Sequence, residues 1–432
     1  MEKQYLETLL AQIREKRAKE YVRQEIAGHI ADQKACYIAD GMSNDQAEEK
    51  AVADMGDPVE TGIALDQIHR PKPAWGMLAM IAVLCAAGVL LQFAVYRYGP
   101  DAQAGRYLFE SQLQYAVFGY FLLCGIYLAD YTKLAKYSRH LCTGILILLS
   151  LTAFCDLPIS FDRLLSLNIL FYLYLPLYGA VLYSYRNCKG KKLWYLFLYT
   201  ILPVYLASQL AYASVRINLA VILFIMLGTA VHKGWFPQPA AKIKYILFTC
   251  VAAAFLLYTL FLNNYQHIRI QAWLNPAAFS AEEGYLQGVI RSLLHNSRLI
   301  GQNTSKLSAY DSLPNYATDY ILSYMIATFG ILAAAVLILF VVLLGAWLLR
   351  LSIRQKNQLG MAMGLGCSLA FVVQSAEYIL VNLALLPASS LYFPLISFGG
   401  SNMLQTCVLL GILLSIYRYE NVAPEPAPYT AI

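Results

Sequence analysis

Two adjacent carboxylates share one segment of this chain with four cations, and these residue types could transfer a proton beside a bound anion. The carboxylates are Glu282 and Glu283, and the cations are Arg269, Arg291, Arg298 and Lys306. A carboxylate can act as a general base, and guanidinium or ammonium groups pair with phosphate oxygens. Solvated charges on a surface loop produce the same pattern, so both interpretations remain open.

A second polar group, Gln374 with Glu377, stands inside a long apolar run. Glu377 lies about seven residues from the end of this run, which in a helix is roughly 10 to 15 Å deep. An unpaired carboxylate at that depth must be protonated or find a hydrogen-bond donor. Glu377 is therefore either part of an interior polar site or a hydrogen-bonded contact between two helices.

A third group opens the last apolar run, where Pro394 and Ser397 precede Gly399, Gly400 and Ser401. Paired glycines let a ligand or another backbone approach closely. Free amide groups at a helix start can hold an anion. Tight packing between helices would favour the same glycines, so this alternative also stays open.

Apolar runs long enough to cross a membrane must position these groups. Hydrophobic residues make up 59% of the 432 residues and charged residues only 13%, against about 25% charged in globular proteins. A hydrocarbon core of roughly 30 Å needs about 20 apolar residues in a helix. The predicted spans are approximately 74–96, 112–129, 138–156, 164–185, 193–212, 216–231, 243–263, 319–349, 358–386 and 392–417. The sequence therefore predicts an all-α polytopic membrane protein with about ten transmembrane helices.

Lysine and arginine gather in every second predicted loop. They are Lys133, Lys136, Arg139, Arg186, Lys189, Lys191, Lys192, Lys233, Lys242, Lys244, Arg350, Arg354 and Lys356. Because short cytoplasmic loops hold an excess of cations, both termini are expected in the cytoplasm and the long segment 264–318 outside. The net charge of +6 then belongs to loops at a membrane face and not to a nucleic-acid-binding surface.

The cysteines predict neither a disulfide framework nor a metal site. Most of the nine lie inside predicted spans, and none lies in the segment 264–318. The chain has no CxxC pair and no histidine cluster. We therefore expect buried thiols, with no metal and no other cofactor.

The first 72 residues predict a separate cytoplasmic helical domain, followed by a membrane domain over 73–420 and a cytoplasmic tail over 421–432. Ser43 with Gln46 resembles a capping box that opens a helix, and Gly56-Asp57-Pro58 stops and restarts the chain. These motifs resemble the short helical module ahead of some bacterial permease-type membrane proteins. The likeness implies regulation or partner docking, and a solvated helical cap is the alternative.

The most specific motif lies at the start of the last span. Residues 387–417 run from Pro387 through Leu-Tyr-Phe-Pro-Leu-Ile-Ser-Phe-Gly-Gly-Ser to Leu-Leu-Ser-Ile-Tyr, and they resemble the signature of the SEDS family of shape, elongation, division and sporulation proteins, among them RodA, FtsW and SpoVE. Asp130-Tyr131, the stretch RIQAWLNP at 269–276, LPNYATD at 313–319 and Gln112 fit the same family. The resemblance covers roughly 74–420 and implies ten spans with a large outer loop.

The resemblance implies a peptidoglycan glycosyltransferase that polymerises lipid II at the bacterial plasma membrane, in cell-wall synthesis, cell division or cell shape. It also implies a class B penicillin-binding protein as partner. A lipid-linked diphosphate needs an apolar groove for its polyprenyl tail and cations for its phosphates, so the four cations of the outer segment are the expected diphosphate ligands. The remaining expected substrate-binding residues are Asp319, Gln374, Glu377, Ser397, Gly399, Gly400 and Ser401.

The acid that the resemblance predicts is replaced. The family implies an Asp shortly after the Asn-Pro of the outer loop, and alignment through Asn275-Pro276 and Gly284-Tyr285 places Phe279 there. Phenylalanine cannot move a proton, so Glu283 or Glu282 is the expected catalytic base. Other polar or acidic family positions are also replaced, at Tyr178, Ala211, Ala317, Ala327, Thr328 and Tyr378.

Three functions are compatible with these features. The first is a lipid II polymerase that uses one of the two loop glutamates. The second is a catalytically silent relative that binds lipid II or a penicillin-binding protein as a scaffold or regulator. The third is a flippase of lipid-linked precursor, which would need polar residues continuous across the spans. Interior charges are few in this sequence, which disfavours the flippase.

Overall fold

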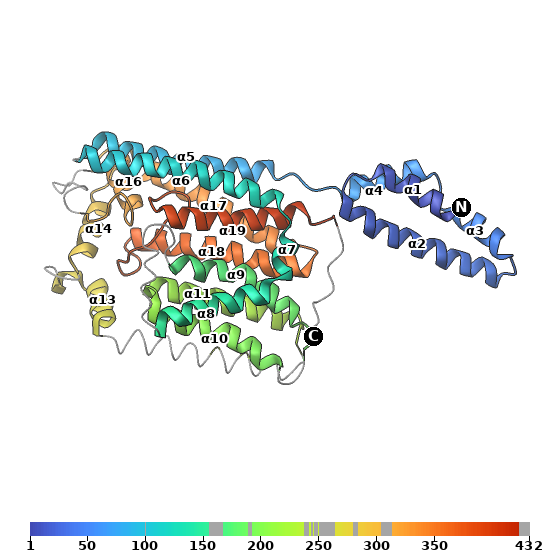
Figure 1. The fold of residues 1–432 in the computed structure, drawn as a ribbon. Coiled ribbons are helices and arrows are strands. Elements are labelled where there is room, and N and C mark those ends of the chain that lie inside the picture. The colour runs from blue at the N-terminus through green and yellow to red at the C-terminus, as the bar shows by residue number, and fades with distance from the viewer. Residues whose placement is uncertain are drawn as a thin grey trace. The chain divides into compact units, whose positions relative to one another are not determined.

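The computed structural model describes residues 1–99, 101–154, 167–188, 192–236, 264–279, 284–303 and 313–422, with isolated positions at 242, 245 and 249. Within these residues all regular structure is helical. The described chain forms two compact units (Figure 1). One contains Met1–Ala74, Gln355–Asn357 and the described residues from Ile416 onward, and the other contains Trp75–Arg354 and Gln358–Ser415.

Four helices form most of the first unit: α1 (Glu2–Gln12), α2 (Lys16–Ala39), α3 (Asn44–Asp54) and α4 (Pro58–His69). Its core contains Leu9, Ile13 and Ile30, which are at most 1% exposed. The predicted start of α3 is confirmed, because the Ser43 hydroxyl accepts a hydrogen bond from the Gln46 N–H. Gly56 turns the chain with a positive φ of 77° before α4 begins.

Residues near the C-terminus complete this first unit. The Lys72 ammonium lies 2.6 Å from a carboxylate oxygen of Glu420, and the Lys72 N–H donates to the Arg418 carbonyl over 2.9 Å. The Nδ1 atom of His69 lies 2.9 Å from the Asn421 carbonyl oxygen. The unit is therefore built from both ends of the described chain.

The second unit contains the apolar helices. They are α5 (Trp75–Tyr98), α6 (Ala102–Leu128), the short α7 (Tyr131–Lys136), α8 (Ser138–Phe154), α9 (Leu167–Ser184), α10 (Lys192–Leu210), α11 (Ala213–His232), α16 (Ile321–Phe329), α17 (Ile331–Arg354), α18 (Gln358–Asn382) and α19 (Gly400–Arg418). Among the described helices, six are long and apolar enough to cross a membrane: α5, α9, α11, α17, α18 and α19. The predicted class, an all-α polytopic membrane protein, is confirmed.

Small residues bring α9 and α18 close together at the centre of this unit. A Cβ atom on Gly179 of α9 would overlap the carbonyl oxygen of Ala362 in α18. A Cβ atom on Gly366 of α18 would lie 2.8 Å from the carbonyl oxygen of Leu175 in α9. Glycine permits such backbone contact between membrane helices, and the contact fixes the spacing of these two helices.

Two predicted spans differ from the structure, and a third stays a prediction. The predicted span 319–349 is divided by Gly330, whose φ of 98° separates α16 from α17. The predicted span 392–417 becomes helical only at Gly400, because Leu395, with a positive φ of 69°, holds the preceding residues in turns. The predicted span 243–263 lies outside the described residues, apart from the positions 245 and 249.

The segment 264–318 contributes α13 (Asn264–Leu274), the 3₁₀ turn η1 (Pro276–Phe279) and α14 (Tyr285–His295). These elements and α16 gather at one end of the second unit (Figure 1). Backbone hydrogen bonds join residues 298–303 to the break at Gly330, since the N–H of Gly301 donates to Phe329 and that of Ile331 to Arg298. Residues 298–303 of this segment are therefore anchored to the break between α16 and α17.

Candidate functional site

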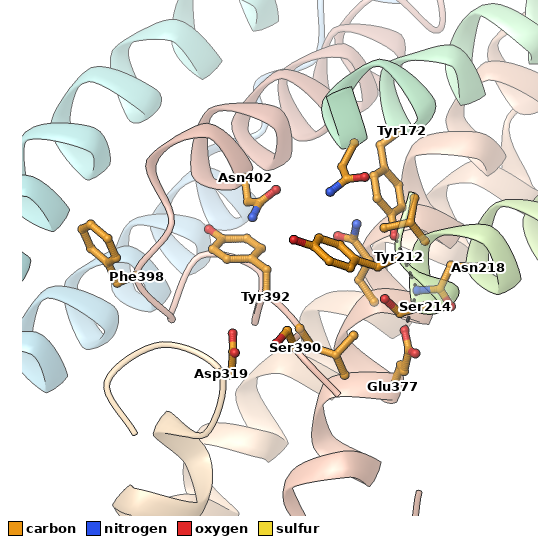
Figure 2. A pocket seen from close by; sticks show the side chains of 14 residues that line it. Tyr172, Tyr212, Ser214, Asn218, Asp319, Glu377, Ser390, Tyr392, Phe398 and Asn402 are labelled. Carbon is orange, nitrogen blue, oxygen red and sulfur yellow. Dashed lines mark hydrogen bonds between the residues drawn. The ribbon is translucent and has the colours of Figure 1, made fainter. Parts of the chain in front are cut away.

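A polar cavity of about 260 Å³ opens at the end of the second unit where α9 and α11 begin and α18 ends. Its lining consists mainly of amide, hydroxyl, aromatic and carboxyl side chains. These residues are Asn168, Tyr172, Tyr212, Ser214, Val215, Asn218, Asp319, Gln374, Glu377, Ser390, Leu391, Tyr392, Phe398 and Asn402. Figure 2 shows Glu377 beside Asn218 at one side and Asp319 near Ser390 and Tyr392 at the other.

Glu377 is held by one neighbour from another helix. The Asn218 amide of α11 donates to Glu377 Oε2 over 2.6 Å and lies 3.4 Å from the Tyr172 hydroxyl of α9. The Glu377 Oε1 atom accepts no hydrogen bond from any residue that the structure describes. Glu377, which lines the cavity, therefore has one oxygen fixed by Asn218 and one oxygen without a donor among the described residues.

Asp319 occupies the loop that leads into α16. Its Oδ2 atom accepts a hydrogen bond from the Asn315 amide over 3.2 Å. Burial raises the pKa of the Asp319 carboxyl above its ordinary value, while the side chains of Ser390 and Asn315 oppose that rise. Asp319 is therefore a partly desolvated carboxyl group with two donors beside it.

Side chains of α18 hold the backbone around Asp319. The Tyr378 hydroxyl accepts from the Ile321 N–H over 3.1 Å and donates to the Thr318 carbonyl over 3.2 Å. The Asn382 amide donates to the Asp319 carbonyl over 3.1 Å, and its oxygen accepts from the N–H of Ser323. These bonds satisfy amide groups that the first turn of α16 cannot pair within the helix.

The residues before α19 are placed by packing. Ser397 is fully buried, and its hydroxyl accepts from the Phe393 N–H over 2.8 Å, so it fixes a turn. A Cβ on Gly399 would lie 3.0 Å from the Tyr392 ring, and one on Gly400 would overlap the Tyr115 ring. Aromatic rings thus occupy the space that the two glycines leave open. Ser401 is half-buried at the start of α19, beside the cavity residue Asn402.

The predicted cations of the described loop do not line this cavity. Arg269 donates to the Ala388 carbonyl, and Arg291 donates to the Trp273 carbonyl over 2.8 Å. Arg291 and Arg298 are exposed. The structure thus brings together Asp319, Gln374 and Glu377 of the predicted residues. Glu282, Glu283 and Lys306 lie outside the described residues.

Several cavity residues escaped the sequence analysis. Asn218 and Ser214 lie in or beside a predicted span, and a polar residue within an apolar run was the available signal. Tyr172, Tyr212 and Tyr392 gave no signal, because the chain contains 33 tyrosines and each of these three has an apolar residue on both sides. Phe279 ends η1, and its carbonyl accepts from the Gly284 N–H over 3.0 Å.

A second cavity, of about 410 Å³, lies between α8 and α10. Its lining is mainly apolar and includes Leu146, Ile147, Phe154, Leu198 and Leu202. The chemistry of this pocket suits a hydrocarbon chain.

The helical bundle with a polar cavity at one end defines a polytopic membrane protein with an interior binding site. The sequence profile of the FtsW/RodA/SpoVE family, described as "Cell cycle protein", matches residues 75–422. The chain therefore belongs to this family. The match begins at α5 and leaves the first unit almost entirely outside.

Relatives of similar sequence carry FtsW names. A probable peptidoglycan glycosyltransferase FtsW of Geobacter sulfurreducens is 31% identical over 188 residues, which are 42% of this chain and 49% of that protein. A probable peptidoglycan glycosyltransferase FtsW of Synechocystis is 30% identical over 168 residues, 38% of this chain and 42% of that protein. The chain therefore spans about half the length of these relatives.

Solved structures support the fold. One, reported for a peptidoglycan synthase complex that coordinates polymerization and crosslinking, is 21% identical with a TM-score of 0.62, covering 80% of this chain and 97% of that chain. The rod shape determining protein RodA of Thermus thermophilus is 17% identical with a TM-score of 0.52, over the same shares of both chains. At these identities the likeness establishes the architecture.

Proposed function

We propose that the protein is a peptidoglycan glycosyltransferase that polymerises lipid II. The observation that carries this proposal is the polar cavity, which places Asp319 and Glu377 among amides and hydroxyls in a chain of this family. Sugar transfer needs a group that removes a proton from the attacking hydroxyl, and a carboxylate is a common choice. The FtsW names of the relatives support the same chemistry.

The remaining parts of a lipid-linked substrate have chemically suitable surfaces. Arg291 and Arg298 are exposed cations of the segment 264–318 and suit a diphosphate. The apolar pocket between α8 and α10 suits a polyprenyl chain. The substrate would then lie with its tail in the membrane and its sugar at the polar cavity.

The proposed setting is the bacterial plasma membrane, with both termini in the cytoplasm and the segment 264–318 outside. The alternation of basic loops supports this orientation. A class B penicillin-binding protein is the proposed partner, in line with the synthase complex among the structural neighbours. The domain 1–72 would dock a regulator on the cytoplasmic side.

One observation favours a second candidate, a catalytically silent protein that binds lipid II or a penicillin-binding protein. Phe279 stands where the family resemblance predicts the acid, and its described polar contact is made through its backbone carbonyl. A chain without a base at the reacting sugar would bind substrate without turnover.

Polymerisation of purified lipid II by the full-length protein in detergent or nanodiscs tests the proposal, alone and with candidate class B partners. Glycan strands from wild type support the polymerase. Loss of the strands in Glu282→Gln/Glu283→Gln would assign the base to the outer loop. Binding of lipid II without any product, where another family member is active, would favour the silent protein. A gain of activity in Phe279→Asp would then show that only the acid is missing.

A further inference from the structure

Glu377 has the geometry of a held proton acceptor. The side chain lines the cavity, one carboxylate oxygen is fixed by Asn218 at 2.6 Å, and the other accepts no hydrogen bond from a described residue. We propose that Glu377 accepts the proton of the acceptor sugar hydroxyl during glycosyl transfer, with Asn218 as its positioning residue. This proposal rests on the proposed function and names the residue that performs the proton transfer.

Three helices fix the position of this carboxylate. Asn218 on α11 is only 4% exposed, and its amide reaches both Glu377 on α18 and the Tyr172 hydroxyl on α9. An ionised carboxylate can only accept hydrogen bonds, so an amide N–H donor suits it. A base held from rigid helices stays closer to its reacting geometry than one on a loop.

Asp319 is less suited to the same role. The Asn315 amide donates to one of its oxygens over 3.2 Å, and the Ser390 side chain interacts with the same carboxyl group. Its backbone is further tied to Asn382 of α18. The Asp319 carboxyl group thus interacts with two side-chain donors, whereas Glu377 accepts from one, so Glu377 has more acceptor sites left for a substrate proton. Asp319 therefore serves as an orienting group in this proposal.

The cavity matches one sugar ring and not a whole glycolipid. Its volume of about 260 Å³ lies below the range of about 300 to 1,000 Å³ for sites that enclose drug-sized ligands. The rings of Tyr212 and Tyr392 offer flat apolar faces, and the Asn402 amide beside Tyr392 offers polar groups (Figure 2). The terminal sugar of the acceptor would enter here, while the diphosphate of the donor remains outside.

The proposed reaction is a single displacement at the anomeric carbon of the donor sugar. The acceptor hydroxyl oxygen forms a bond to the anomeric carbon of the donor sugar. The bond between that carbon and the diphosphate oxygen breaks, and its electron pair leaves with the polyprenyl diphosphate. The hydroxyl proton passes to Glu377 Oε1 and is then released to water.

The test is Glu377→Gln in the full-length protein, assayed for both lipid II polymerisation and lipid II binding. The glutamine oxygen can still accept from Asn218, so the fold should persist, and thermal unfolding checks this. Removing a general base should lower the polymerisation rate by about 100-fold or more, while the dissociation constant of lipid II changes less than about threefold. Glu377→Asp should recover part of the rate. Glu110→Gln, at an exposed glutamate in the third turn of α6 that pairs with Arg106, is the matched control.

Asn218→Leu tests the positioning role separately. It should lower kcat with little change in KM, because the carboxylate loses its anchor but the sugar contacts remain. Asn218→His, which keeps an N–H donor, should recover part of kcat. A loss of stability that accounts for the whole effect would overturn this role.

The outcomes separate this proposal from the proposed function. Active wild type with Glu377→Gln within about threefold of its rate overturns the role of Glu377 and leaves the polymerase standing. Equal losses of binding and turnover in Glu377→Gln would make Glu377 a binding residue and also overturn it. Wild type that binds lipid II but makes no polymer overturns the polymerase, and the proton-acceptor role with it.

Discussion

Replacing Tyr378 by phenylalanine removes one oxygen atom that two backbone groups use. The Tyr378 hydroxyl accepts from the Ile321 N–H at 3.1 Å and donates to the Thr318 carbonyl at 3.2 Å. Tyr378 and Ile321 are fully buried. The phenylalanine ring can still stack on Phe393, where the centroids are 4.5 Å apart, so the change is confined to hydrogen bonding.

The expected magnitude follows from the buried N–H of Ile321. A buried polar group left without a partner costs about 1 to 3 kcal/mol. Because about 1.4 kcal/mol corresponds to a tenfold change, local opening at the start of α16 should become roughly 5-fold to 150-fold more frequent. Asp319, two residues earlier, should lose its fixed position, and lipid II polymerisation should fall with it.

Hydrogen exchange measured by mass spectrometry on peptides covering residues 318–326 tests this expectation in a nanodisc. Exchange in Tyr378→Phe should be faster by the stated factor, with peptides from α5 unchanged. Tyr96→Phe, a half-buried tyrosine on α5 that stacks on Phe109, is the control and should leave residues 318–326 unaffected. Exchange within about twofold of wild type would refute the claim that this hydroxyl holds the start of α16.

Three further predictions concern packing and pH. Gly179→Ala should lower the thermal unfolding midpoint and the yield of monodisperse protein, because its Cβ meets the Ala362 carbonyl, whereas Gly144→Ala, with open space around it, should not. Burial raises the native pKa of Asp319 above its ordinary 3.8, so the folded state keeps a proton that the unfolded chain loses. The free energy of unfolding should therefore fall as pH rises from 3.8 through the native pKa of Asp319. The thermal unfolding midpoint should show this fall in wild type, and the fall should be absent in Asp319→Asn. Hydrogen bonds from Lys34 and the N-terminal amino group lower the pKa of Glu48 to about 2 from 4.5, so their stabilising effect is present above pH 4.5 and is lost as pH falls toward 2. Pepsin should then cut the first unit increasingly fast between pH 4.5 and 2 in wild type, and Lys34→Gln should show a smaller change over the same interval.

Hydropathy was sufficient to predict the class of fold and most of its helices. Apolar length decides which segments enter a membrane, and α5, α9, α11 and α18 begin and end within a few residues of the predicted spans. Local capping was also readable, since Ser43 does cap α3. Hydropathy could not reveal the break at Gly330, because one glycine barely changes the mean hydropathy of a long apolar run.

The cavity was only partly predictable, because it depends on contacts between distant residues. Glu377 stood out as an acid in an apolar run, but its donor Asn218 lies 159 positions earlier. No local pattern joins these two residues or adds Asp319 to them. Gly399 and Gly400 show the converse case, because their motif was specific in the sequence and suggested a binding site. In the structure, the Tyr392 and Tyr115 rings lie against these two glycines.

The first unit combines N-terminal helices with residues that the ribosome synthesises much later. Its four helices end by His69, but its partners for His69 and Lys72 include Asn421 and Glu420. The partners in each contact are roughly 350 residues apart in the sequence. At about 5 to 20 residues per second, a ribosome needs roughly 20 to 70 s to synthesise the residues between them. The N-terminal helices are therefore exposed without their final contacts while the membrane helices insert. A chain truncated before Ile416 would lack these contacts, so its N-terminal helices would stay without them.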